Sequence, residues 1–310
     1  MTIVVCGSLA YDTIMVFEGQ FRKHILPDRI HILNVSFMVP QMHRYFGGCA
    51  GNIAYNLWLL GDQPAIMATV GHDFKPYGKR LKELGLTDRH VRRVDDQFTA
   101  QAFITTDLED NQITAFHPGA MMFSHLNKIA DAPEATLGIV SPDGRDGMFE
   151  HSRGFAKAGV PYLFDPGQGL PMFSGADLLE LIAPAKALTV NDYEAQIVEE
   201  RTGKKVAELA TMVEAVVVTR GAEGSIVHTG GQQIEIPCVR PDGVVDPTGC
   251  GDAYRAGLLH GLAKGWDWGK SARLASVLGA FKIAHRGGQN HQPTLEKIAA
   301  KFKEEFGESL

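Results

Sequence analysis

The sequence predicts an α/β fold, in which helices cover a mostly parallel central sheet and a small separate β-element is attached to it. A short apolar run at residues 3–6, close to the amino terminus, is typical of a buried central strand. From residue 137 onward, short apolar runs alternate with helical stretches, which indicates β–α–β units. Two earlier segments, at approximately 12–46 and 98–118, carry strand-like runs without helical periodicity, and they predict the small β-element.

The composition is that of a folded globular protein. The chain has 310 residues, of which 45% are hydrophobic and 21% are charged, and this mixture supplies a large core. The formal net charge of −6 and the lack of a basic block argue against nucleic acid or an anionic membrane as a partner. The four cysteines show no C-x-x-C spacing, and the chain opens without a basic leader or a long apolar run. We therefore expect a reduced, cytoplasmic protein.

The first half of the chain mixes the central strands with the small β-element. The buried strand at 3–6 is closed by Gly7 and Ser8, and short strands of the small element are expected at 13–17, 30–37 and 41–46. Gly51-Asn52 opens an apolar helix that Gly61 ends. The elements then expected are a helix at 53–60, a strand at 64–70, a helix at 76–84, a short strand near Val91, and a hairpin of 99–106 with 112–116 around an acidic turn.

The second half alternates strands and helices. Each expected strand is a short apolar run, and each expected helix is a longer stretch that follows it. The strands are 137–140, 161–164, 187–190 and 215–219, the helices are 147–158, 176–183, 192–201 and 206–213, and a hairpin of 225–228 with 232–236 precedes helices at 251–264, 268–284 and 295–306. Because the small β-element comes from two separate segments, we expect it to be inserted in one large domain that spans residues 1–310.

The most informative motif is Asp-Pro-Thr-Gly-Cys-Gly-Asp at residues 246–252, which leads into a predicted helix. Gly249 and Gly251 flank a turn at the helix N-terminus, where unpaired backbone N–H groups and the helix dipole favour an anion such as phosphate. Asp252, in the first turn, is placed to take a proton from a hydroxyl held beside that turn. The same pattern is also typical of a plain Gly-rich turn with an acidic helix start.

Three weaker motifs follow strands or open helices. Gly48 would let the backbone approach a ligand, and Asn52 offers a donor and acceptors to a sugar hydroxyl; the alternative is a helix with an Asn cap. Asn191 and Glu194 lie three apart after a strand and suit hydrated Mg²⁺, or equally a helix cap. The Gly-rich loop at 219–225 could face phosphates through Arg220, although an ordinary strand–turn–strand has the same pattern.

Two cysteines, Cys49 and Cys250, lie in the Gly-rich turns. A thiolate at a helix N-terminus can be reactive, but no base accompanies either cysteine in an evident motif. We expect both to be small fillers beside a ligand.

Together, the segments at 47–52, 191–194 and 246–252 resemble the ribokinase-like (PfkB) family of sugar and nucleoside kinases, in order and over essentially the whole chain. Within the family, the chain is most similar to bacterial adenosine and broad-specificity nucleoside kinases. The resemblance implies a ribokinase-like αβα sandwich with a small β-sheet lid. It also implies Mg·ATP as the phosphoryl donor and a 5′-hydroxyl as the acceptor.

The resemblance assigns a role to individual residues. Asp252 is implied as the general base, and the backbone N–H groups of Gly249, Cys250 and Gly251 as the anion hole. The remaining implied positions are Asp12, Gly48 and Asn52 at the ribose hydroxyls, Asn191 and Glu194 at Mg²⁺ and the phosphates, Thr219, Gly221 and Gly224 at the ATP phosphates, the stretch from Ala280 to Asn290 beside the nucleotide base, and Asp246 and Thr248 at a K⁺ ion.

The acceptor can be narrowed further. Ser8, Ser36 of the lid and the segments at 116–121 and 165–168 match nucleoside kinases best. Phe103 and Phe116 fall on the predicted lid hairpin, where they either stack on a flat base or form lid core. Gln168 can hydrogen-bond a base edge, and Gly169, where some relatives carry a polar side chain, predicts a roomy base pocket.

The sequence therefore predicts a purine nucleoside kinase that serves purine salvage, either a strict adenosine kinase or one that also accepts inosine, guanosine or cytidine. The alternatives are a ribokinase- or fructokinase-like sugar kinase and a non-catalytic nucleoside-binding relative. The resemblance also implies a homodimer that forms through the lid, because exposed lid edges favour strand pairing.

Overall fold

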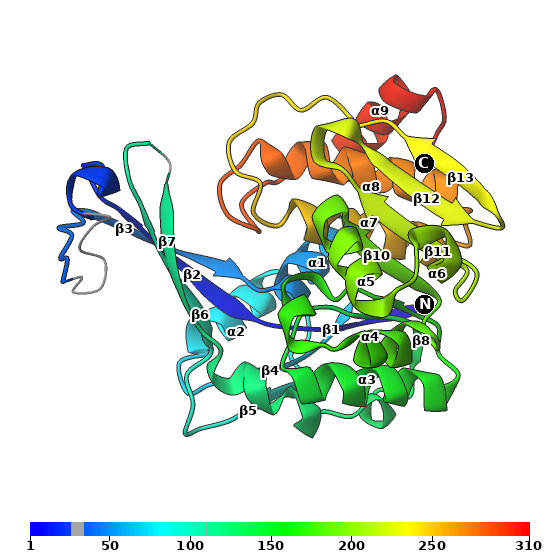
Figure 1. Cartoon of the computed structure of the whole chain (residues 1–310), viewed down its shortest axis with the longest axis horizontal. Coiled ribbons are helices and arrows are strands. Elements are labelled where there is room, and N and C mark those ends of the chain that lie inside the picture. Colours follow the sequence, from blue (N-terminus) through cyan, green and yellow to red (C-terminus); the bar gives the residue numbers. More distant parts are fainter. Residues whose placement is uncertain (26–33, 110) are drawn as a thin grey trace.

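The computed structural model describes residues 1–25, 34–109 and 111–310 (Figure 1). Within this part of the chain, the larger sheet has nine strands in the order β13-β12-β11-β10-β9-β8-β1-β4-β5. The strands from β11 through β5 pair in parallel, and β12 and β13 are added antiparallel at one edge. Their bounds are β1 Thr2–Cys6, β4 Ala65–Val70, β5 Val91–Arg93, β8 Ala135–Val140, β9 Tyr162–Phe164, β10 Ala187–Asn191, β11 Ala215–Thr219, β12 Ser225–Thr229 and β13 Gln232–Ile236.

Helices cover both faces of this sheet, so the fold is an αβα sandwich. Because side chains alternate along a strand, β1 sends Ile3 and Val5 into one core and Val4 and Cys6 into the other. The first core is closed by α1 Cys49–Leu59, α2 Lys75–Glu83, α7 Cys250–Ala263, α8 Trp268–Ile283 and α9 Leu295–Phe306. The second is closed by α3 Arg145–Ala158, α4 Gly175–Ile182, α5 Asp192–Thr202 and α6 Val206–Leu209. Short 3₁₀ turns are η1 Phe21–Lys23, η3 Gly119–Leu126, η4 Ile129–Asp131, η5 Gly167–Met172 and η6 Gly221–Glu223.

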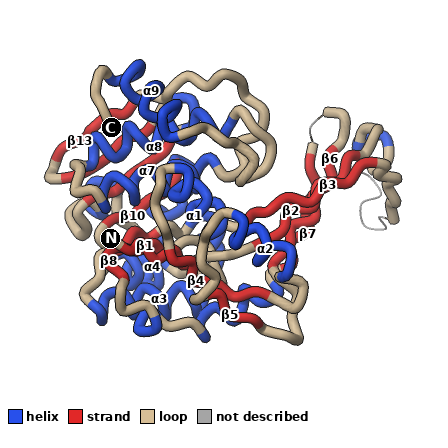
Figure 2. The backbone as a smooth tube through the Cα atoms, turned by 180° about the vertical axis from the view of Figure 1, so that it is seen from behind, coloured by secondary structure: helices blue, strands red, loops and turns tan. Residues whose placement is uncertain are grey.

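A second, four-stranded sheet projects to one side of the sandwich (Figures 1 and 2). We call it the small sheet; its order is β3-β2-β6-β7. Its strands are β2 Ala10–Val16, β3 Gln41–Gly47, β6 Ala100–Thr106 and β7 Gln112–His117. The strands come from two segments that are separated by α1, β4, α2 and β5 of the sandwich. The predicted α/β class with an additional small β-sheet is confirmed.

The structure corrects three predicted elements. The strand at 30–37 lies partly outside the described residues, and its described part, 34–37, has no regular structure. The helix at 206–213 ends at Leu209. Helix α1 begins at Cys49, not at residue 53, because Gly48 adopts a positive φ of 85° and the Ser8 carbonyl accepts the N–H of Ala50 at 3.0 Å. In the part of the chain that is described, no helix has the length and apolar character needed to cross a membrane.

Candidate active site

The two most specific sequence motifs meet at the carboxyl edge of the large sheet. Ligands of open α/β sheets bind at this edge. Asn52, inside α1, donates from Nδ2 to Oδ2 of Asp252 in α7 at 2.8 Å. Gln289 fixes the Asn52 amide from the other side, because its Nε2 donates to Asn52 Oδ1 at 3.3 Å. Asn52 is therefore no helix cap: its side chain orients the Asp252 carboxylate.

The environment of Asp252 suits a general base. Burial raises the pKa of its carboxyl to about 6; the hydrogen bond from Asn52 and the charge of Arg255 oppose this rise, while the Asp165 carboxylate adds to it. A carboxylate with this pKa is ionised at neutral pH and still basic enough to accept a proton. The geometry and the charge of Asp252 thus both fit proton abstraction from a bound hydroxyl.

A buried ion pair lies behind Asp252. Arg255, one turn further along α7, binds both carboxylate oxygens of Asp165 through Nε at 2.9 Å and Nη2 at 3.2 Å. The two side chains are only 6% and 5% exposed. Such bidentate pairing compensates the cost of burying both charges. Sequence reasoning missed Arg255, and the available signal was a charged residue within the otherwise apolar run of α7.

The turn at 249–251 has the backbone expected of an anion cradle. Gly249 has a φ of 80°, which a side chain would strain, and it caps α7. The three expected donors are not equivalent, because the N–H of Cys250 donates to Pro247 O within the turn at 3.1 Å. The N-terminus of α7 nevertheless directs its dipole at this point, beside Asp252.

A cavity of about 360 Å³ adjoins this turn, and its walls are mainly apolar. The cavity runs from the loop after β11, past the turn, to the middle of α8. Its lining includes six residues from the predicted nucleotide set or the turn: Thr219, Gly221, Gly224, Cys250, Gly251 and Ala280. Asn290 lies elsewhere: it is exposed and donates to Arg286 O at 2.7 Å. The cavity has the size and the apolar lining to hold a flat heterocycle, and phosphates attached to that heterocycle would reach the turn.

Ser8 and Gly48 hold the start of α1. Ser8 Oγ accepts the N–H of Cys49 at 3.1 Å. A Cβ added at Gly48 would lie 2.5 Å from Ser8 O, so only glycine lets the two segments approach this closely. Ser8 and Gly48 thus hold the segment after β1 against the first turn of α1, the helix that carries Asn52.

Asp12 lies on the face of the small sheet that carries Tyr45, Ala102 and Phe116, as the cross-strand register shows. Burial raises the pKa of the Asp12 carboxyl to about 6, and the negative charge of Asp246 contributes. Asp12 therefore lies close enough to Asp246, in the loop before α7, for the two charges to interact.

The register separates the two aromatic residues of the hairpin. Phe103 is opposite Ala115, and Phe116 is opposite Ala102, so the two rings point to opposite faces of the small sheet. Phe116 shares the face of Asp12, and Phe103 does not. The two rings therefore cannot stack on the same base, and the stacking alternative stays open for Phe116 on the face of Asp12.

Three further acceptor-site expectations concern peripheral positions. Ser36 and Gln168 are both exposed, the first in irregular structure and the second in η5. A Cβ at Gly169 would lie 3.2 Å from Met172 Cε and 3.4 Å from Met148 Sδ. The space expected beside Gly169 is thus already filled in this direction.

Asn191 and Glu194 form a reciprocal cap at the start of α5. Asn191 Oδ1 accepts the N–H of Glu194 at 2.7 Å, and Glu194 Oε2 accepts the N–H of Asn191 at 2.8 Å. Burial raises the pKa of Glu194, and the Asp165 carboxylate contributes. The cap leaves one Glu194 oxygen for a further partner, and a second negative charge, Asp165, is close by.

Asp246 and Thr248 lie in the loop that leads into α7, and this loop is bound to the end of α8. Asp246 accepts the N–H of Thr248 at 2.8 Å and that of Gly287 at 2.7 Å. The Asp246 carbonyl, expected to face K⁺, instead accepts Lys282 Nζ at 2.8 Å. The expected K⁺ site at this carbonyl is therefore filled by a side chain, and sequence reasoning missed Lys282.

The cysteines are not activated. Burial raises the pKa of Cys49 well above its usual range, with the Asp252 carboxylate adding to the effect, and burial raises the pKa of Cys250 to about 11. Neither thiol is a thiolate at neutral pH, as the filler interpretation expects.

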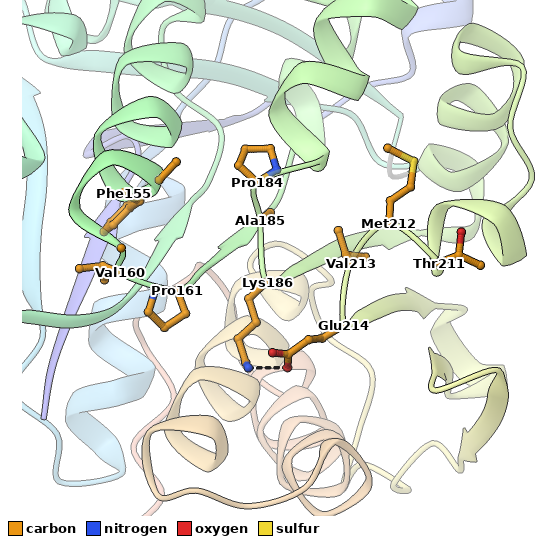
Figure 3. Close-up of a pocket in the computed structure, with 12 residues that line it drawn as sticks. Phe155, Val160, Pro161, Pro184, Ala185, Lys186, Thr211, Met212, Val213 and Glu214 are labelled. Carbon is orange, nitrogen blue, oxygen red and sulfur yellow. Dashed lines mark hydrogen bonds and ion pairs between the residues drawn. The ribbon is translucent and has the colours of Figure 1, made fainter.

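A second cavity, of about 680 Å³, lies away from this region (Figure 3). It lies before the amino ends of β9, β10 and β11, where Lys186 and Glu214 form an ion pair. None of the predicted site residues lines it. In the described residues, no group of three or more His, Cys, Asp and Glu is arranged to hold a metal ion. The candidate active site is therefore the region around Asp252.

Comparisons with known proteins show the family and the fold of the chain. The family model described as "pfkB family carbohydrate kinase" matches residues 4–295. A nucleoside kinase of Burkholderia thailandensis, determined in complex with inosine, is 51% identical, has a TM-score of 0.91 and matches over 99% of each chain. A nucleoside kinase of Methanocaldococcus jannaschii is 33% identical over 87% of this chain and 89% of its own. The ribokinase of Thermotoga maritima, 20% identical with a TM-score of 0.82, shares the fold over 98% of this chain and 99% of its own.

The fold and the site define a phosphotransferase that acts on a hydroxyl group. The chain belongs to the pfkB family of carbohydrate kinases, which confirms the family resemblance and the ribokinase-like fold.

Proposed function

We propose that this protein is an ATP-dependent nucleoside kinase that phosphorylates the 5′-hydroxyl of a purine nucleoside. The observation that carries the proposal is the Asn52–Asp252 contact beside the α7 N-terminus, because it joins a base, an orienting amide and an anion cradle. The Burkholderia thailandensis kinase, which is 52% identical in its complex with ADP-inosine, supports a nucleoside acceptor and an adenine nucleotide donor.

In the proposed reaction, Asp252 accepts the proton of the 5′-hydroxyl while that oxygen attacks the terminal phosphorus of ATP, whose bond to the bridging oxygen breaks so that ADP leaves. Asn52 keeps one carboxylate oxygen in place. The backbone of the 249–251 turn and the α7 dipole stabilise the charge on the transferred group. The Asp165–Arg255 pair links α7 to the end of β9 and fixes the positions of one carboxylate and one guanidinium behind Asp252.

The donor is proposed to bind with its base in the cavity between the loop after β11 and α8, and its phosphates toward Gly251. Mg²⁺ fits the chemistry of the site: Glu194 and Asn191 would hold it through water molecules, because Glu194 keeps one carboxylate oxygen beyond the α5 cap and Asn191 Oδ1 keeps a second lone pair. When bound, it would neutralise phosphate charge.

We call the face of the small sheet that carries Asp12 and Phe116 the inner face, and the face that carries Phe103 the outer face. The acceptor is proposed to lie between Asp252 and the inner face, with Asp12 at the ribose and Phe116 against the base. In this arrangement the small sheet acts as a lid over the acceptor. Gln168, which is exposed in η5, is proposed to hydrogen-bond the base edge.

The test is an ADP-release assay with Mg·ATP and adenosine, inosine, guanosine, cytidine, ribose and fructose as acceptors. We expect turnover with the purine nucleosides and little with the free sugars. Turnover only with ribose or fructose would replace the proposal by a sugar kinase. Binding of inosine without any turnover would identify a non-catalytic relative.

A further inference from the structure

Lys282 is a fully buried lysine beneath the candidate active site. It lies in the last turn of α8 and has no exposed surface. Its Nζ donates to the carbonyl of Asp246 at 2.8 Å and to that of His285 at 2.9 Å. Lysine is almost never fully buried unless it is paired, so this ammonium group requires an explanation.

The surroundings stabilise a positive charge at this point. The two carbonyls replace water around the ammonium group, and the carbonyl end of the α8 dipole favours a cation. Burial lowers the pKa of Lys282, and the negative charges of Asp246 and Asp252 oppose this fall and favour its charged form. The two carbonyls and the two carboxylates therefore offset part of the cost of burying the ammonium group.

The same ammonium group joins two loops. One loop, at 245–249, leads into the anion turn, and the other, at 284–288, follows α8. Val245 and Asp246 donate their N–H groups to Ile283 O at 2.9 and 3.1 Å, which aligns the first loop with the end of the helix. A Cβ on Gly249 would lie 3.7 Å from Lys282 Cε, so the lysine passes directly under the turn.

The geometry points to Lys282 as a tethered replacement for the monovalent cation expected at the Asp246 carbonyl, so that this enzyme works without K⁺. A K⁺ ion at this carbonyl would compete with the ammonium group for the same oxygen and would be repelled by its charge. Lys282 is a positioning residue: it acts on the reaction through the loop and turn that it fixes. The inference rests on the proposed kinase function.

The first experiment compares the unmodified enzyme in KCl and in tetramethylammonium chloride at equal ionic strength. We expect the same turnover and the same melting temperature in both salts. A specific rise of either quantity with K⁺ would overturn the inference, because it would show a separate cation site. The melting temperature needs no substrate, so it also decides the matter if no acceptor is phosphorylated, in which case only the proposed function fails.

The second experiment uses two variants of the same residue. Lys282→Ala removes the charge and leaves space in front of the two carbonyls; we expect a loss of about 10²-fold in turnover, which K⁺ or NH₄⁺ partly restores. Lys282→Met removes the charge but fills the space, so we expect the same loss without rescue. Equal behaviour of the two variants in every salt would mean that Lys282 only packs. Lys264→Ala, which changes an exposed lysine at the end of α7, is the matched control.

Folding of the variants is measured separately by circular dichroism. If both variants unfold, the melting temperature of the unmodified enzyme in the two salts still tests the inference. A rise in the melting temperature of Lys282→Ala with K⁺, but not with tetramethylammonium, would support it without any activity measurement.

Discussion

Asp252 owes its chemistry to burial and to three neighbours, two of which are distant in the sequence. Its amide partner comes from α1, the carboxylate that raises its pKa comes from the end of β9, and the guanidinium that lowers it comes from the next turn of α7. Burial is the main cause of the raised pKa of Asp252, and the hydrogen bond from Asn52 and the charge of Arg255 limit the rise. The balance of burial and charge thus places its pKa in the range that proton abstraction requires.

Replacing Asp252 by Asn tests its role as the base. The amide keeps the size of the side chain but cannot accept the proton, so turnover should fall by about 10²–10⁴-fold while nucleoside affinity changes little. Steady-state kinetics and calorimetric titration with inosine measure the two effects. Near-normal turnover would remove Asp252 from the mechanism.

The pH profile follows from the same carboxyl group. Because the active form is deprotonated and the pKa is about 6, kcat/KM should be constant above neutrality and fall tenfold per unit well below pH 6. The rate falls toward low pH because protonation of Asp252 removes the base. Rates measured from pH 5 to 8, with the stability of the enzyme checked at each pH, give the profile. A constant rate down to pH 5 would contradict it.

The limits of sequence reasoning are clearest for these residues. Gly249 and Asp252 could be placed from local spacing because the helix start itself defines their role. Arg255 and Lys282 could not be placed, since each is buried by contacts with residues 90 and 36 positions away in the sequence. A charged side chain in a helix is ordinarily solvated, so the apolar neighbours of Arg255 in α7 were the available local signal of its burial.

At the scale of elements, the small sheet has two faces with different neighbours. Arg44 stacks on Tyr11 at 3.7 Å and pairs with Asp73 at the base of the outer face. Beyond this base, the outer face carries the exposed side chains of Met42, Phe103 and Ile113. The register that separates Phe103 from Phe116 depends on how the hairpin turns, and residue spacing alone does not reveal it.

The outer face of the small sheet is proposed as the contact between two copies of the chain, because apolar side chains are exposed there and β3 and β7 leave the sheet with two edge strands. Phe103→Asp should therefore convert a dimer into a monomer, whereas Phe116→Ala should weaken nucleoside binding and leave the dimer intact. Light scattering after size-exclusion chromatography measures the mass. A monomeric unmodified protein at micromolar concentration would refute the proposed contact.

At the scale of the whole molecule, the parallel sheet collects buried carboxyl groups at one edge. Asp143 follows β8 and is 2% exposed; burial raises its pKa to about 8, although the N–H of Gly144 opposes the rise. The α/β class could be predicted because alternating apolar runs reflect this architecture directly. The order of the strands and the pairing of Asp165 with Arg255 depend on tertiary contacts and could not.

The stability of the fold should fall between pH 6.5 and 8. In this window Asp143 binds a proton in the folded state but not in the unfolded state, so the free energy of unfolding decreases as pH rises, by up to about 1.4 kcal/mol per pH unit. Asp143→Asn should abolish this slope. Urea denaturation at pH 6.5 and 8 measures both proteins, and equal slopes would contradict the prediction.

The contact between Asn52 and Asp252 also has a consequence for protein synthesis. The ribosome makes α1 early, and β1, β4 and β8 can pair long before α7 exists. Until α7 emerges, Asp165 lacks its arginine, and burying it alone would be costly. A nascent or prematurely terminated chain that ends before residue 252 would thus contain Asn52 and Asp165 without Asp252 and Arg255. We therefore expect the packing of α7 on the sheet to close the sandwich and complete the active site in the same step.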